Sequence, residues 1–151
     1  MPFFRVALLL LLCAGVALSQ NTADPNLMPL PASYQPAAGR MIVDQSFSVV
    51  LSGHKEARLD RAVGRFEDQL ALRTGSRYIA KPAAGAKTTL TIKTDHASKD
   101  VQAVGEDESY VLEITPAGAT LTAPNPLGVI HGVETFLQLV RPAPPREPFV
   151  D

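Results

Sequence analysis

The sequence predicts an α+β domain: an antiparallel β-sheet with two α-helices packed on one of its faces. Two observations lead to this prediction. Apolar residues recur at helical spacing in two separate segments, and they alternate with polar residues at strand spacing in the segments around them. Because the alternation puts apolar side chains on one face of the strands only, the sheet is expected to be covered on one side and wet on the other.

The first 19 residues have the three parts of a signal peptide. Arg5 supplies the charged start, residues 6–18 are apolar, and Ala17-Leu18-Ser19 puts small residues where a signal peptidase cleaves. The apolar run is shorter than the roughly 20 residues of a membrane span. We therefore expect a mature chain that begins at Gln20, exported to a bacterial periplasm or exterior, with no membrane attachment after cleavage.

Composition excludes several classes of partner. The single cysteine, Cys13, lies in the signal peptide, so the mature domain is held by packing and not by disulfides. The formal net charge is −1 and no basic run stands out. Nucleic acid and anionic membranes are therefore not expected as partners.

The mature chain opens on a proline-rich, extended lead-in over residues 20–39, and the domain itself is expected over residues 40–141. Residues 40–51 predict two short strands, with Asp44-Gln45-Ser46 as the turn between them. The first helix is expected to start after Ser52-Gly53 and to stop at Gly75. Its core stripe consists of Leu59, Val63, Phe66 and Leu70.

A second stripe on this helix holds Arg58, Arg61 and Arg65. Such a stripe forms an anion site or a solvated face. Acidic neighbours, among them Asp60 and Glu67, favour the solvated face.

Three further strands are predicted around Thr88–Thr94, Tyr110–Thr115 and residues 120–122. Leu90 and Ile92 share an apolar face with Leu112 and Ile114, whereas the opposite face is rich in threonine. Asn125 then caps a second helix whose first residue is Pro126.

Gly128 and Gly132 lie four residues apart beside the apolar stripe of this second helix, with Leu139 adjoining them. Glycine inside a helix costs about 1 kcal/mol relative to alanine, so a close approach of another element is expected there. Residues 142–151 follow as a proline-rich linker that contains Phe149. We interpret Gly128, Gly132, Leu139 and Phe149 as a candidate interface to a following domain.

No catalytic, metal or cofactor site is predicted. His54, His96 and His131 are far apart in the sequence, and the pair His131/Glu134 lacks a third ligand at zinc-site spacing. The carboxylates in residues 106–108 are adjacent, whereas a general acid and base stand on opposing walls of a cleft. The sequence also has no Gly-x-Ser-x-Gly motif, no cysteine in the mature chain and no glycine-rich phosphate loop.

Three segments resemble exported β-N-acetylhexosaminidases of glycoside hydrolase family 20. Leu27-Met28-Pro29-Leu30-Pro31 resembles the opening of those enzymes, and residues 107–114 are similar to their strand preceded by an acidic turn. Residues 128–140 are similar to their helix of the form Gly-x-x-x-Gly-x-x-Thr-x-x-Gln-Leu, which is the most specific of the three motifs. The resemblance, from the first motif to the last, extends over nearly the whole mature chain.

The resemblance implies an N-terminal non-catalytic domain, followed in the family by a catalytic (β/α)8 barrel. In that barrel an Asp-Glu pair in a His-x-Gly-Gly-Asp-Glu setting works with the acetamido group of the substrate. Asp107-Glu108 lacks this setting, so no catalytic residue is carried over. The expected partners are thus a barrel downstream and, through it alone, a glycan.

Two other functions remain open at this point. A free-standing exported module that binds a glycan or the cell wall would be supported by an aromatic platform, but the chain has no tryptophan and three tyrosines. A small proteinase inhibitor would need an exposed inhibitory loop, and the sequence offers no candidate.

Overall fold

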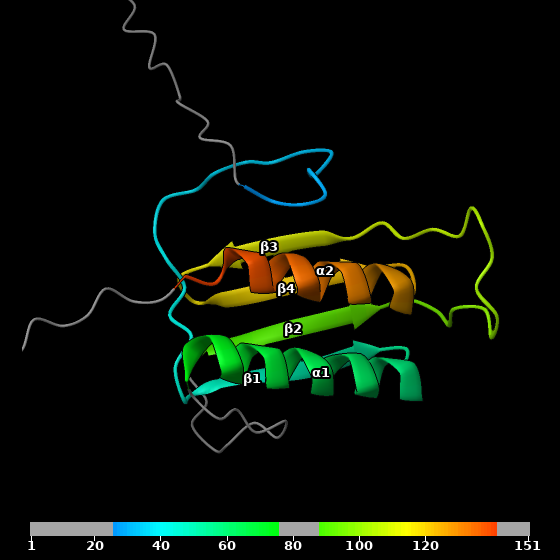
Figure 1. Ribbon diagram of the computed structural model, residues 1–151, viewed down its shortest axis with the longest axis horizontal. Helices are drawn as coiled ribbons and strands as arrows, with labels where there is room; N and C mark the ends of the chain where they lie inside the picture. The colour runs from blue at the N-terminus through cyan, green and yellow to red at the C-terminus, as the bar shows by residue number, and fades with distance from the viewer. Residues whose placement is uncertain (1–25, 76–87, 142–151) are drawn as a thin grey trace, which may run out of the picture.

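The computed structural model describes residues 26–75 and 88–141, which form one four-stranded sheet with two helices on the same face (Figure 1). The expected signal peptide, the start of the lead-in, the linker 142–151 and Phe149 lie outside the described residues. The elements in chain order are β1 (Phe47–Gly53), α1 (Ala57–Thr74), β2 (Thr88–Thr94), β3 (Val111–Thr115), β4 (Gly118–Ala123) and α2 (Pro126–Leu139).

The sheet is mixed, with the strand order β1-β2-β4-β3, so the prediction of an antiparallel sheet is wrong in this respect. β1 pairs with β2 and β2 with β4 in parallel, and only β3 and β4 are antiparallel. The connections explain the difference. β3 and β4 are joined by a tight turn, whereas α1 lies between β1 and β2 and carries the chain back to the starting edge, as a parallel pair requires.

The two faces of the sheet are those the alternation predicted. On the helix face Leu90 lies between Val49 and Ala119, and Ile92 lies between Leu51 and Leu121. Figure 1 shows α1 and α2 side by side over this face, both running in the same direction. The opposite face carries threonine side chains and is not covered by either helix.

α1 begins at Ala57, later than predicted, because β1 continues to Gly53. It ends at Gly75, which has a φ of 69° and donates its N–H to Ala71 O, as expected for a glycine stop. Ahead of β1, Phe47 N–H donates to Asp44 O across the predicted turn, but only one strand forms there, not two. Met41 and Val43 still pack against the core.

Three phenylalanines occupy the centre of the core. The ring centroids of Phe66 and Phe136 are 5.5 Å apart, and Phe47 lies 6.4 Å from Phe66 and 5.9 Å from Phe136. Phe66 is 1% and Phe136 3% exposed, so each helix contributes one buried ring. The rings join both helices to β1 in one apolar cluster.

Candidate functional site

The two helix glycines face the sheet of this chain. A Cβ atom on Gly128 would collide with the carbonyl oxygen of Ser109, and one on Gly132 would collide with the side chain of Leu121. Both glycines are buried. The expected close approach is therefore present, but the approaching elements are β4 and the segment before β3, and the expectation that these glycines face a following domain is corrected.

The helical wheel correctly predicted that the two glycines lie beside the main apolar stripe of α2. The prediction that this side of the helix faces a following domain was wrong, because it faces β4 and Ser109. The stripe divides between two surfaces, since α2 packs on α1 as well as on the sheet. Leu139 is half-buried. A contact of Leu139 or Phe149 with another domain stays a prediction.

Side-chain hydrogen bonds hold the start of α2 in place. Asn125 Oδ1 accepts from Leu127 N–H at 2.8 Å, and Asn125 Nδ2 donates to Asp107 O at 2.6 Å. Nearly three turns further along α2, the hydroxyls of Tyr110 and Thr135 lie 2.6 Å apart. These bonds join α2 to the segment that leads into β3, at the point where Gly128 lets that segment approach.

The acidic turn before β3 does not form an acid/base pair. Asp107 Oδ1 accepts from Ser109 N–H at 2.9 Å, and hydrogen bonds from Ser109 lower the pKa of the Asp107 carboxyl. Glu108 instead pairs with His131 at 3.1 Å, and both side chains are largely exposed. Glu106 accepts from Ala103 N–H within the same loop. Each carboxylate thus has a separate partner.

Each histidine of the described residues has a different contact. His54 contacts Glu56 at 3.3 Å, His96 contacts Ala97 O, and His131 contacts Glu108. Among residues 26–75 and 88–141, no three histidine, cysteine, aspartate or glutamate side chains gather as a metal site would require. Neither helix in this part of the chain is long and apolar enough to cross a membrane.

Arg58 anchors the loop that contains Ser98, Lys99 and Asp100. Its guanidinium donates to Ser98 Oγ at 2.6 Å and to the carbonyl oxygens of Lys99 and Asp100, and it also lies beside Glu56. Arg61 and Arg65 are exposed. The stripe is therefore partly structural and partly a solvated face.

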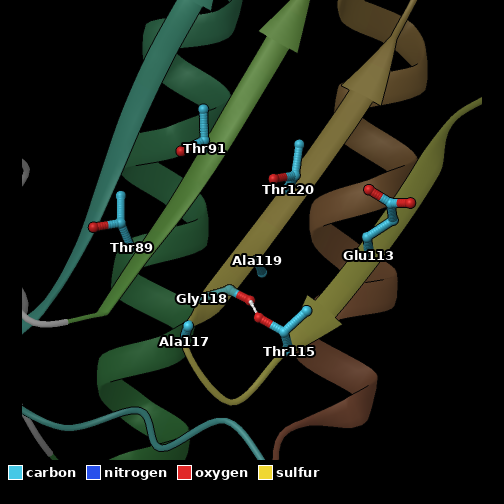
Figure 2. Close-up of a pocket in the computed structure, with 8 residues that line it drawn as sticks. All are labelled: Thr89, Thr91, Glu113, Thr115, Ala117, Gly118, Ala119 and Thr120. Atoms are coloured by element: carbon cyan, nitrogen blue, oxygen red, sulfur yellow. Dashed lines mark hydrogen bonds between the residues drawn. The ribbon is translucent and has the colours of Figure 1, made fainter. Parts of the chain in front are cut away.

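The uncovered face of the sheet bears a shallow trough of about 340 Å³. Figure 2 shows its side chains standing on β2, β4 and β3, with the helices behind the sheet. Thr91, Thr120 and Glu113 lie side by side on neighbouring strands, and the turn at Gly118 closes one end, where Thr115 Oγ1 donates to Gly118 O at 3.0 Å. The full lining is Thr89, Thr91, Glu113, Thr115, Ala117, Gly118, Ala119 and Thr120.

The chemistry available in this trough is limited. Glu113 is the one carboxylate among its lining residues, and glycoside hydrolysis by a carboxylate pair needs a second one about 5–10 Å away. The lining also lacks an aromatic ring on which a sugar could stack. The trough offers hydroxyl groups and a single negative charge, without a nucleophile or an acid/base pair.

Gln138 has a role that the sequence did not reveal. Its side-chain amide accepts from Met28 N–H and donates to Met28 O, both at 2.8 Å. The amide thus fixes the lead-in on α2 across 110 positions of the chain. The sequence contains both segments, but no local pattern connects them.

These features define an α+β domain that, over its described residues, has a polar open sheet face and no catalytic pair. Comparisons with known proteins identify the family. Residues 24–147 match the family model described as "Glycosyl hydrolase family 20, domain 2". The chain belongs to glycosyl hydrolase family 20, and the match assigns it to this domain.

Solved structures agree with the family model. The chain is 31% identical to the chitobiase of Flavobacterium johnsoniae, with a TM-score of 0.64 over 77% of this chain and 18% of that one. It is 26% identical to the N-acetyl-beta-hexosaminidase of Streptomyces plicatus, with a TM-score of 0.57 over 77% of this chain and 21% of that one. No match was found among curated proteins. The chain thus corresponds to about a fifth of the length of these enzymes.

Proposed function

We propose that this chain is the N-terminal accessory domain of an exported β-N-acetylhexosaminidase that acts on glycans containing N-acetylglucosamine or N-acetylgalactosamine. In this proposal the chemistry belongs to a catalytic barrel that follows on the polypeptide, and the chain alone is inactive. The main support is the family match over residues 24–147 together with the small share of the hexosaminidases that the chain covers.

The placement of the carboxylates supports inactivity of the isolated chain. Asp107 accepts a hydrogen bond from Ser109, and Glu108 is paired with His131. Glu113 is the one acid among the trough-lining residues. A function as a free-standing glycan-binding module has less support, because the trough lacks an aromatic platform.

Hydrolysis of an aryl N-acetylglucosaminide tests whether catalysis requires the barrel. Purified residues 20–151 should give no turnover above buffer. The same residues, followed by the part of the F. johnsoniae chitobiase that lies outside the matched region, should give turnover. Activity that co-purifies with residues 20–151 alone and disappears in Glu108→Gln would overturn the proposal.

Export has its own test. The arrangement of Arg5, the apolar residues 6–18 and Ala17-Leu18-Ser19 predicts cleavage before Gln20. Intact-mass measurement of the protein secreted by a bacterial host should find Gln20 or a near neighbour at the N-terminus. Retention of Met1 would refute the signal peptide and, with it, the exported location.

A further inference from the structure

Residues 26–31, here called the strap, are held on α2 in a way that keeps two apolar side chains in solvent. Gln138 binds both the N–H and the carbonyl oxygen of Met28, and Leu27 beside it is buried. The backbone of Met28 is thereby fixed. Yet Met28 is 81% exposed and Leu30 is 69% exposed.

Single exposed apolar residues are common on protein surfaces and need no explanation. The six residues of the strap, Asn-Leu-Met-Pro-Leu-Pro, carry no charge, as is also true of residues 101–105, which hold exposed Val101 and Val104; the strap, however, is bound to the last turn of α2. Leu72, which is also exposed, has Arg73 beside it, and exposed Val101 follows Asp100. A surface that covered the strap would not have to desolvate a charged group of the strap itself, and the centre of a stable interface is depleted in charge for this reason.

The position of the strap indicates which surface would cover it. Gln138 lies one residue before the end of α2 at Leu139, so the strap is attached next to the point where the chain leaves the helix. The related enzymes are about five times as long as the part that this chain matches. A domain that followed α2 would be tethered within a few residues of the strap, at an effective concentration of about millimolar.

We infer that the strap, through Met28 and Leu30, is a docking surface for the domain that follows α2 on the same polypeptide. The inference rests on the proposed function, which supplies that domain. It also assigns Gln138 a positioning role: the amide orders the strap in advance, so docking does not have to order a free segment.

Methionine oxidation measures the contact directly. Residues 20–151 contain two methionines, Met28 on the strap and half-buried Met41 against the core. The isolated chain is compared with the fusion to the remainder of the F. johnsoniae chitobiase. Because oxidation follows exposure, covering Met28 should slow formation of its sulfoxide about tenfold in the fusion, while Met41 reacts equally in both proteins.

Paired variants separate docking from folding. Met28→Glu with Leu30→Glu should leave the thermal midpoint of the isolated chain unchanged, since both side chains are in solvent, and should lower that of the fusion. The matched control is Ile42→Glu, which changes an equally exposed apolar residue, 69% exposed, outside the strap and should lower neither midpoint.

Each outcome is decisive. Met28 that reacts equally fast in the isolated chain and the fusion, or a fusion as sensitive to Ile42→Glu as to the strap variants, refutes the docking surface. Protection of Met28 in a fusion that hydrolyses no substrate supports the docking surface and counts against the proposed function alone.

Discussion

Replacement of the helix glycines by alanine tests the packing of α2 against the sheet. Three glycines occupy helix positions: Gly64 in α1, and Gly128 and Gly132 in α2. The intrinsic effect of glycine to alanine inside a helix is a stabilisation of about 0.5–1 kcal/mol, and it applies to all three. What differs is the space that the new methyl group meets.

The space around each new methyl group predicts the order of stability of the three alanine variants. At Gly64 nothing lies within 4 Å of the new Cβ, so Gly64→Ala should gain the full intrinsic term. At Gly132 the methyl group displaces the fully buried side chain of Leu121, an overpacking cost of about 1–3 kcal/mol that exceeds the gain. At Gly128 the obstacle is the backbone oxygen of Ser109, which cannot rotate away, so Gly128→Ala should lose the most.

Urea unfolding of residues 20–151, followed by far-UV circular dichroism, measures these differences as shifts of the midpoint at constant slope. The expected order of stability is Gly64→Ala, wild type, Gly132→Ala, Gly128→Ala. Stabilisation by all three substitutions would show that α2 does not approach the sheet as described. Gly64→Ala is the matched control, since it makes the same chemical change in open space.

Three further predictions concern the core, the helix cap and a buried acid. Phe66→Ala should lower stability by about 3–5 kcal/mol in urea unfolding, whereas the surface control Lys93→Ala should change it little. Asn125→Ala should cost about 1–2 kcal/mol by removal of the cap. Asn125→Ser, which keeps a cap acceptor but loses the donor to Asp107 O, should cost less; equal losses would contradict the role of the cap. Burial raises the pKa of Glu67 above its ordinary 4.5, so the folded state binds its proton more tightly than the unfolded state and stability should fall as the pH rises through the raised pKa. Glu67→Gln should therefore raise the urea midpoint at neutral pH and not in acid below the ordinary pKa; an equal effect at both would refute the assignment.

Local chemistry in the sequence predicted the helix ends that depend on it. Asn125 and Pro126 begin α2, and Gly75 ends α1, because each acts on backbone groups within a few residues. Burial of Phe66 and Phe136 followed from helical periodicity alone. The start of α1 was misplaced, since Ser52-Gly53 fits both a helix start and the end of a strand.

The direction of the strands could not be read from the same pattern. Alternation of apolar and polar residues has the same period of two in parallel and antiparallel strands. The threonine face and the apolar face were therefore predicted, and the mixed sheet was not. The resemblance of residues 128–140 to a family helix predicted the family, and the match of residues 24–147 to the family model confirms it.

The sequence by itself determined the two helices, the one-sided sheet and membership of the family, because spacing along the chain encodes each of them. Only the tertiary structure decided which neighbour each helix surface meets. Gly128 and Gly132 turned out to accommodate Ser109 and Leu121 of their own domain, and Gln138 binds Met28 across 110 positions. A helical wheel gives the direction of a side chain about its own axis, whereas the element found in that direction depends on how distant segments pack.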